Sequence, residues 1–286
     1  MTRNLPETAV EIAEEVGAGR IDPSLVVRRS LERIAARDGE LNALTRINPD
    51  AVPDAIRLDR RLEAGERLPL AGVPVVIKDN IWVEGLRVTQ GARLYEHFVA
   101  PQDAEAVRRL RQAGAVVVGI GTCSEFACKG VTNTPLYGKT RNPVDPRLTP
   151  GGSSGGPAVA VAAGYVPLAL GTDAGGSTRR PPAHVGVIGF KPSQDLVPYG
   201  PGFHEPVWGI STICPIAQEM ADVILAMRVL GGVEVQPPLG VARLAYATRF
   251  GLDQPLDADV AENFQRVITR LGAAGYPLTE ASPEWP

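Results

Sequence analysis

Two glycine-rich stretches of the sequence each contain a serine that could act as a nucleophile. Residues 151–156 contain Ser153 and Ser154, and residues 171–179 contain Ser177. A serine hydroxyl is a weak nucleophile until a neighbouring base removes its proton. Small residues before Ser177 would also allow backbone N–H groups to approach a substrate carbonyl and hold its developing negative charge. The two stretches therefore indicate catalysis by a serine nucleophile.

Lys78 is the residue that we expect to act as the base for these serines. It directly follows the apolar run at residues 73–77, and none of the three histidines stands beside either glycine-rich stretch. Lysine is rarely buried without a partner, so a lysine at the end of a buried strand is informative. Loss of water lowers the pKa of a lysine, which allows the amine to accept a proton near neutral pH. A lysine that simply leaves the strand for solvent is the alternative.

Three other interpretations of residues 151–156 remain open, and each meets an objection. A flexible linker is not expected between two segments with ordered-looking patterns. A phosphate-binding loop requires Lys and then Ser or Thr after the last glycine, where this sequence has Pro157 and Ala158. A nucleophile elbow matches the pattern Gly-x-Ser-x-Gly around Ser153, but it needs a strand leading into the turn, whereas residues 142–150 are proline-rich.

The elements that must position these residues predict an α/β fold. Residues 103–118 read as a helix that ends at a glycine and is followed by a buried strand, which is typical of an α/β layer. Asp22 followed by Pro23, Asp103 and Asp257 are expected to cap helices. The expected helices are residues 7–16, 22–37, 50–70, 103–113, 217–230 and 257–271, with a buried one from 157. The expected strands are residues 73–77, 115–118, 165–170, 185–190, 241–245 and 277–281.

Composition restricts the class of protein further. The chain has 286 residues, of which 44% are hydrophobic and 21% charged, so it has ample material for a core. We predict one domain over residues 1–286, with residues 231–240 as a weak candidate linker because they are rich in Gly and Pro. The net charge of −3 gives no electrostatic reason to expect a nucleic acid or an anionic membrane as partner. No window approaches the roughly 20 apolar residues of a membrane span.

The cysteines and the N-terminal residues predict a cytoplasmic protein. Cys123, Cys128 and Cys214 are an odd and sparse set, which suits reduced thiols. The N-terminal residues lack the apolar segment of a secretion signal. Cys123 and Cys128 do not have the two-residue gap of common zinc sites and have no His nearby, so we interpret them as small buried hydrophobic residues. We predict no metal and no cofactor.

Taken together, these motifs resemble the amidase signature family, whose members hydrolyse amides with a Ser–cis-Ser–Lys triad. They occur in the order and spacing of the family, with 75 positions from Lys78 to Ser153 and 24 from Ser153 to Ser177. The resemblance extends over roughly residues 5–275 and implies a central mixed β-sheet covered by helices on both faces. Family members usually continue further, which implies that the C-terminal part of the family fold is missing here. The matching segments are residues 72–80, 140–143, 150–156, 171–179 and 189–192.

The resemblance implies a role for each residue of the site. Ser177 would be the nucleophile that accepts the acyl group, and Ser153, preceded by a cis peptide bond, would bridge it to the base. Lys78 would be the general base and then, through Ser153, the acid that protonates the leaving amine. The oxyanion hole would be formed by the backbone N–H groups of Ala174, Gly175, Gly176 and Ser177. Supporting roles would fall to Ser154, as a hydrogen-bond donor, and to Asp173 and Arg179, as an ion pair that holds the turn.

Three functions follow from the resemblance. The first is an amidase that converts a carboxamide to a carboxylate and an amine or ammonia through a serine acyl-enzyme. The second is the A-type subunit of a glutamyl-tRNA amidotransferase, although residues 194–200 and 203–209 differ from what we expect of that protein. The third is an inactive truncated remnant. The expected partner is a small-molecule amide, with a homodimer as an open option.

The sequence does not identify the acyl group of the substrate. Phe203, Trp208 and Ile210 could line the pocket, but packing in the core explains them equally well.

Overall fold

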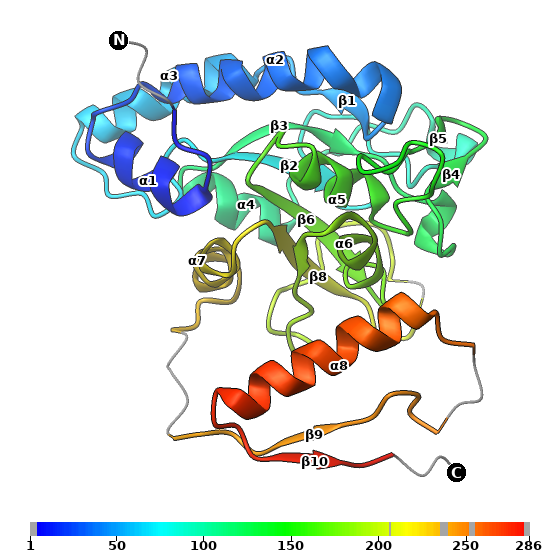
Figure 1. Ribbon diagram of the computed structural model, residues 1–286. Coiled ribbons are helices and arrows are strands. Elements are labelled where there is room, and N and C mark those ends of the chain that lie inside the picture. Colours follow the sequence, from blue (N-terminus) through cyan, green and yellow to red (C-terminus); the bar gives the residue numbers. More distant parts are fainter. Residues whose placement is uncertain (1–4, 206, 235–239, 252–254, 283–286) are drawn as a thin grey trace. The chain divides into compact units, whose positions relative to one another are not determined.

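A mixed six-stranded β-sheet forms the centre of the computed structural model, which describes residues 5–205, 207–234, 240–251 and 255–282. The strand order is β1-β3-β2-β6-β8-β7 (Figure 1). Strand β2 is parallel to its neighbours β3 and β6, and the other pairs are antiparallel. These strands are β1 (Leu44–Ile47), β2 (Pro74–Lys78), β3 (Val116–Gly121), β6 (Leu168–Asp173), β7 (Ile188–Gly189) and β8 (Thr212–Ala217).

The helices cover both faces of this sheet, as the family resemblance implied. Successive side chains of a strand point to opposite faces. In β2, Val75 and Ile77 pack with helices α1, α4 and α7, whereas Val76 packs with α2, α3 and α5. The α/β prediction with helices on both faces is therefore confirmed. These helices are α1 (Ala9–Gly17), α2 (Pro23–Leu41), α3 (Ala51–Glu63), α4 (Glu105–Gln112), α5 (Gly155–Ala162) and α7 (Met220–Gly231).

Short elements complete the loops around the sheet. They are the 3₁₀ turns η1 (Arg93–Tyr95) and η2 (Glu125–Ala127), the hairpin of β4 (Asn133–Thr134) with β5 (Gly138–Lys139), and helix α6 (Arg180–Val185).

The structure differs from the sequence expectation around β7 and β8, and it contains strands β1, β4 and β5 and helix α6, which the sequence did not predict. Residues 180–185 form helix α6, so the strand expected at 185–190 shrinks to β7. Residues 212–217 form the buried strand β8, although a helix was expected from 217. Pro215 obscures this strand in the sequence, because proline is rarely found in the middle of a sheet. Here its carbonyl accepts a hydrogen bond from the Phe190 N–H (3.2 Å).

The expected helix caps are present at Asp22 and Asp257 but not at Asp103. The Asp22 and Asp257 carboxylates accept hydrogen bonds from the first-turn N–H groups of α2 and of α8 (Ala258–Ala273). Ala104 occupies the N-cap position of α4 instead of Asp103. The Asp103 carboxylate accepts a hydrogen bond from the Glu84 N–H (2.8 Å) and pairs with Arg111 (3.4 Å). Asp103 therefore joins a loop to α4 rather than beginning the helix.

The chain divides into two compact units, Met1–Glu234 and Val235–Pro286. The division falls within the candidate linker 231–240, of which residues 235–239 lie outside the described residues. The second unit contains α8 and a parallel pair of strands, β9 (Leu244–Tyr246) and β10 (Leu278–Glu280). The rings of Tyr246 and Phe264 lie 6.3 Å apart within it. The prediction of one domain over residues 1–286 stays a prediction.

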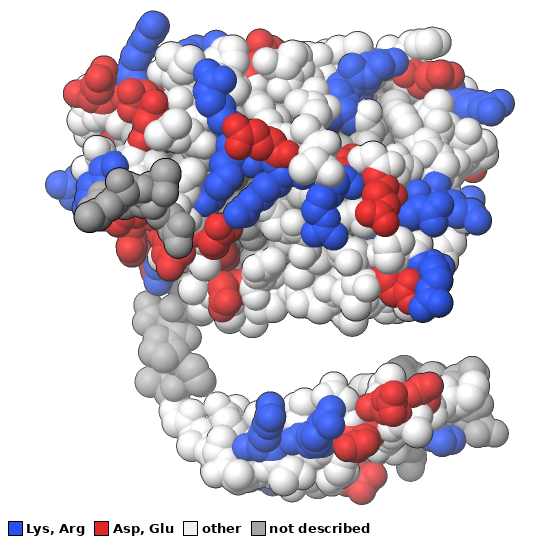
Figure 2. All heavy atoms as spheres, turned by 45° about the horizontal axis from the view of Figure 1, so that its top comes forward, with Lys and Arg blue, Asp and Glu red and all other residues white. Residues whose placement is uncertain are grey.

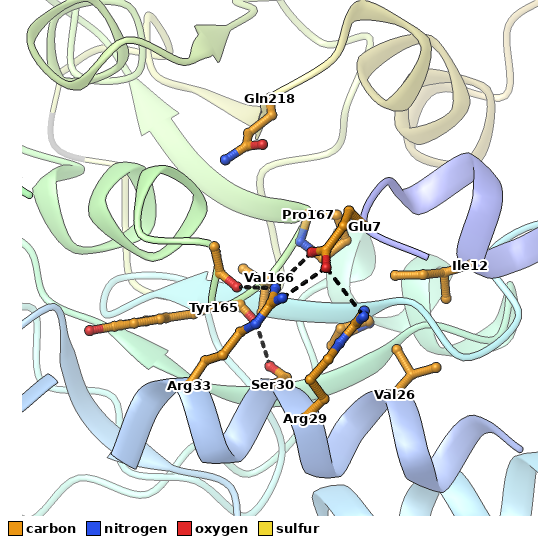
Figure 3. A pocket seen from close by; sticks show the side chains of 12 residues that line it. Glu7, Ile12, Val26, Arg29, Ser30, Arg33, Tyr165, Val166, Pro167 and Gln218 are labelled. Atoms are coloured by element: carbon orange, nitrogen blue, oxygen red, sulfur yellow. Dashed lines mark hydrogen bonds and ion pairs between the residues drawn. The ribbon is translucent and has the colours of Figure 1, made fainter. Parts of the chain in front are cut away.

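Glu7 ties the N-terminal segment to helix α2 in a cavity of about 30 Å³ (Figure 3). Its carboxylate accepts hydrogen bonds from Arg33 (2.7 and 2.8 Å) and lies 3.4 Å from Arg29. The Ser30 hydroxyl donates to the Tyr165 carbonyl (2.6 Å) in the same place. These contacts fix α2 against the chain that leads into β6, so the cavity serves the fold and lies apart from the predicted catalytic residues.

The surface carries charges of both signs. On the face shown in Figure 2, Lys and Arg side chains are interspersed with Asp and Glu side chains. Among the described residues, no helix combines the length and the apolar character needed to cross a membrane.

Candidate active site

Lys78 and Ser153 are in direct contact inside the protein. Strands β2 and β6 are parallel neighbours, so their C-terminal ends lie at the same edge of the sheet. Lys78 is the last residue of β2, and its side chain is fully buried. Its Nζ atom lies 2.8 Å from Ser153 Oγ and 2.7 Å from Thr172 Oγ1, which belongs to β6. The structure thus excludes the alternative of a lysine that leaves the strand for solvent.

Burial changes the protonation of this lysine. Removal from water lowers the pKa of Lys78 from 10.5 to about 8. A minor but usable fraction of the amine is therefore neutral near physiological pH and can accept a proton. The Ser153 hydroxyl, which is itself fully buried, is its neighbour for that transfer.

The turn that carries Ser153 depends on close approach of the backbone. The Gly152–Ser153 peptide bond is cis, as the family resemblance implied. A Cβ atom on Gly152 would lie 2.7 Å from the Val131 nitrogen, and one on Gly156 would lie 2.2 Å from the Thr122 nitrogen. Both glycines are therefore required for packing, and residues 151–156 are an ordered turn that leads into α5 rather than a flexible linker.

Ser154 connects the two glycine-rich stretches. Its N–H donates to the Ser177 carbonyl (3.3 Å). Its hydroxyl lies 3.3 Å from the Thr172 carbonyl oxygen and 3.4 Å from the Thr172 nitrogen. These contacts agree with the supporting role predicted for Ser154.

Asp173 and Arg179 form the predicted ion pair at the turn that carries Ser177. Arg179 Nη2 and Nε lie 2.8 and 2.9 Å from the Asp173 carboxylate, which is fully buried. The same carboxylate accepts hydrogen bonds from the N–H groups of Gly176 (2.7 Å) and Thr178 (3.1 Å). Burial acts to raise the pKa of Asp173, but the hydrogen bonds from Arg179 and the turn outweigh it, and the pKa lies below 3.8.

The contact between Gly176 and Asp173 corrects one part of the predicted oxyanion hole. The Gly176 N–H already donates to Asp173, so it is not free to bind a substrate oxygen. The predicted donor set is therefore reduced to the N–H groups of Ala174, Gly175 and Ser177. The sequence could not reveal this difference, because it depends on the direction in which one peptide group of the turn points.

A cavity of about 180 Å³ brings the two serines together. It is lined by Ser153, Ser177 and Ala174 from the glycine-rich turns and by Thr172 from β6. The remaining lining residues come from the loops after β2, β3 and β7: Asn80, Gln90, Phe126, Ala127, Cys128, Tyr199, Phe203, His204, Val207 and Ser211. Of the three pocket candidates from the sequence, Phe203 lines this cavity, whereas Trp208 and Ile210 are exposed (96% and 57%).

Sequence reasoning missed Thr172 and Asp79. Thr172 contacts Lys78 and also accepts a hydrogen bond from Asn80 Nδ2 (3.1 Å). A polar residue in a fully buried strand needs a partner, and that was the available signal. The fully buried Asp79 carboxylate accepts hydrogen bonds from the Thr89 N–H (2.8 Å) and the Gly91 N–H (3.0 Å) and contacts the Thr89 hydroxyl. Burial raises the pKa of Asp79 to about 7.

The cysteines do not form part of a metal site in the described residues. Cys123 and Cys214 are buried and Cys128 is exposed, and all three are free. Cys123 fits the interpretation as a small buried residue, whereas the exposure of Cys128 contradicts it. Within the described part of the chain, no group of three or more His, Cys, Asp or Glu side chains could hold a metal ion.

The fold thus places a buried Lys78–Ser153 contact, a cis peptide bond before Ser153 and the Ser177 turn at one cavity. The chain belongs to the amidase family, whose model matches residues 25–286. Its solved structural relatives include an amidase (TM-score 0.86, 32% identity), where the match covers 96% of this chain and 63% of the other. They also include a peptide amidase in complex with the inhibitor chymostatin (TM-score 0.84, 30% identity; 96% and 61% covered).

Curated relatives include the A-type subunit of glutamyl-tRNA(Gln) amidotransferase from several bacteria. The protein from Deinococcus radiodurans is 44% identical over 227 residues, which are 79% of this chain and 46% of the relative. The protein from Geobacter sp. (strain M21) is 34% identical over 293 residues, with 96% and 60% covered. The chain thus spans about half the length of the curated relatives that it matches.

Proposed function

We propose that this chain carries the catalytic machinery of an amidase that hydrolyses the C–N bond of a carboxamide, giving a carboxylate and an amine or ammonia. The contact between the buried Lys78 amine and the Ser153 hydroxyl carries this proposal. Family membership and the likeness to amidases of known structure support it. Residues 78, 153 and 177 are proposed as base, relay and nucleophile.

The proposed reaction begins with a proton transfer. Ser177 Oγ gives its proton to Ser153 Oγ, which passes its own proton to the neutral Lys78 amine, while Ser177 Oγ attacks the carbonyl carbon. The N–H groups of Ala174, Gly175 and Ser177 are proposed to hold the oxygen that becomes negative. The proton then returns from Lys78 through Ser153 to the leaving nitrogen, and the C–N bond breaks. Water attacks the acyl-Ser177 ester by the same route and releases the carboxylate.

Covalent labelling tests the nucleophile directly. A fluorophosphonate probe is expected to label the purified protein once, at Ser177, and Ser177→Ala is expected to abolish the label. Lys78→Ala is expected to slow labelling strongly because no base remains. Labelling that persists in Ser177→Ala would reject Ser177 as the nucleophile, and absence of labelling in the unmodified protein would favour the inactive remnant.

A second candidate function is the amide-hydrolysing component of an amidotransferase. The identity of 44% to the A-type subunit from Deinococcus radiodurans favours it. A component of this kind would release ammonia from glutamine for use by protein partners. Ammonia release from simple amides by the chain alone, with no preference for glutamine, would decide for the amidase. Activity on glutamine that appears only with a partner protein would decide for the amidotransferase.

A cytoplasmic location, a small-molecule amide as partner and the absence of nucleic-acid and membrane partners are part of the same proposal. The free thiols and the interspersed surface charges in Figure 2 support it. A homodimer remains an open option, which sedimentation of the purified protein would test.

A further inference from the structure

Aromatic side chains from separate loops gather at the cavity that contains Ser177. We call Trp82, Tyr95, Phe98, Phe126 and Phe203 the aromatic cluster. The ring centroid of Phe203 lies 4.8 Å from that of Tyr95, 5.2 Å from Phe98 and 5.7 Å from Trp82. The ring of Tyr95 also lies 6.4 Å from that of Phe126. These separations allow favourable contacts between rings.

Two members of the cluster, Phe126 and Phe203, line the cavity itself, together with Tyr199. Only 5% of the chain is aromatic, so this concentration is not a general property of the sequence. Phe126, Phe203 and Tyr199 therefore form an aromatic wall of the cavity that holds the two serines, and the other rings of the cluster pack behind Phe126 and Phe203.

The backbone of Phe126 adopts an unfavourable conformation. Its φ and ψ angles are 52° and 20°, in the left-handed region that bulky residues rarely occupy. The Phe126 N–H donates to the Gln90 carbonyl (2.8 Å), which holds the residue in place. The side chain nevertheless remains 40% exposed, so burial in the core does not explain the conformation. Strained residues of this kind concentrate at sites that bind ligands.

Among the described residues, the polar part of the cavity offers no carboxylate, ammonium or guanidinium group to a charged ligand, and the imidazole of His204 is its lining group of a basic kind. No Asp, Glu, Lys or Arg lines it in the described part of the chain. A substrate ammonium would lose water there without an anionic partner, and a carboxylate would have only the His204 imidazole beside it, so burial of either charge is costly. The cavity volume of about 180 Å³ is large enough for one aromatic ring, because an apolar cavity of about 150 Å³ can hold a benzene molecule.

We infer that the aromatic cluster binds an uncharged aromatic substituent of the amide substrate, with Phe126 and Phe203 in direct contact with its ring. The inference rests on the proposed function, because it concerns the specificity of the same site. It narrows the substrate class from carboxamides in general to aryl-substituted amides without a formal charge. Glutamine, which carries two charges, falls outside this class.

Binding to the Ser177→Ala variant tests the inference without requiring turnover. Calorimetric titration is expected to show that phenylacetamide binds at least about tenfold more tightly than acetamide or glutamine. Phe203→Ala in the same background should remove most of that preference, and Phe203→Leu should retain part of it. Trp208→Ala is a matched control because Trp208 lies in the same loop, is 96% exposed and does not line the cavity. It should leave the preference unchanged.

A pair of covalent reagents separates the inference from the proposed function. Phenylmethanesulfonyl fluoride and methanesulfonyl fluoride both react with activated serines, and they differ only by the phenyl ring. The ratio of their rates at Ser177 is expected to fall about tenfold in Phe203→Ala and to stay unchanged in Trp208→Ala. An unchanged ratio in Phe203→Ala, or equal binding of phenylacetamide, acetamide and glutamine, would overturn the inference. No reaction at Ser177 with either reagent would instead count against the proposed function.

Discussion

Thr172 Oγ1 lies 2.7 Å from Lys78 Nζ, so the buried amine has a second hydroxyl partner besides Ser153. The Thr172 hydroxyl also accepts a hydrogen bond from Asn80. It also accepts a hydrogen bond from the Lys78 amine, which stabilises the charged form of the lysine and fixes the direction of its side chain. Thr172 is accordingly a positioning residue for the base.

We expect Thr172→Val to lower both the rate of Ser177 labelling and the pKa of Lys78. Valine has nearly the shape of threonine but cannot accept a hydrogen bond from the amine. The rate of Ser177 labelling above pH 8 should fall about tenfold. The midpoint of the rise of this rate with pH should move to lower pH. Thr172→Ser should restore both quantities. An unchanged midpoint in Thr172→Val would show that the hydroxyl does not act on Lys78.

The pKa of about 8 for Lys78 predicts the pH dependence of activity. The proposed base must be neutral, so the rate of amide hydrolysis should rise with pH through a single proton loss near 8. The rate profile between pH 6 and 10 measures this midpoint. A midpoint above 10, as for a lysine in water, would contradict the proposal of a dry amine.

Lys78 should also be costly for stability, and the sign of the effect follows from the same pKa. Below pH 8 the lysine is charged in both folded and unfolded protein, and the full burial cost is present. Between about 8 and 10.5 the folded protein loses its proton first, so this cost disappears as the pH rises. Lys78→Met should therefore abolish activity yet raise the free energy of unfolding at pH 7, by up to ~3 kcal/mol. Urea unfolding should show that the difference in the free energy of unfolding between Lys78→Met and the unmodified protein is smaller at pH 10 than at pH 7.

Asp173→Asn should loosen the turn that carries Ser177. The Asp173 carboxylate accepts hydrogen bonds from Gly176, Thr178 and Arg179, and an amide cannot replace both oxygens as acceptors. We expect a loss of about 1–3 kcal/mol in stability and slower labelling of Ser177. Arg179→Met, which leaves the turn N–H contacts in place, should have the smaller effect on labelling. Equal labelling rates in Asp173→Asn and in the unmodified protein would contradict this role.

The same carboxylate predicts sensitivity to acid. The pKa of Asp173 is below 3.8 in the folded protein, so its contribution to stability is present above that value and lost as the pH falls further. The free energy of unfolding, measured by urea titration between pH 5 and pH 2, should therefore fall less steeply with decreasing pH in Asp173→Asn than in the unmodified protein.

Cys128 should be the cysteine that reacts with thiol reagents in the folded protein. Cys123 and Cys214 are buried and burial raises the pKa of both thiols, whereas Cys128 is exposed and lines the cavity with Ser177. Mass spectrometry should show one adduct of N-ethylmaleimide, at Cys128, with slower labelling of Ser177 by a bulky fluorophosphonate. Cys128→Ser should prevent both effects. Three N-ethylmaleimide adducts in the folded protein would contradict the burial of Cys123 and Cys214. An unchanged rate of Ser177 labelling after modification of Cys128 would contradict the position of Cys128 at the cavity.

The sequence by itself determined the α/β class and was sufficient to propose the residues of the site. Lys78, Ser153 and Ser177 could be identified because glycines that permit close backbone contact surround the serines and a buried strand precedes the lysine. These are local properties of the chain, and the spacing of the motifs adds the family resemblance. The same local reasoning failed at strand β8, where Pro215 hides a strand that its neighbours in the sheet stabilise.

Tertiary structure alone decided which groups the proposed catalytic residues contact. Thr172 faces Lys78 because β2 and β6 pair in parallel and in one particular register, which no local pattern specifies. Gly176 turns its N–H to Asp173 rather than to the cavity, and the aromatic cluster assembles from loops that are far apart in the sequence. Such contacts depend on how distant segments pack, and packing is a property of the whole fold rather than of any one stretch.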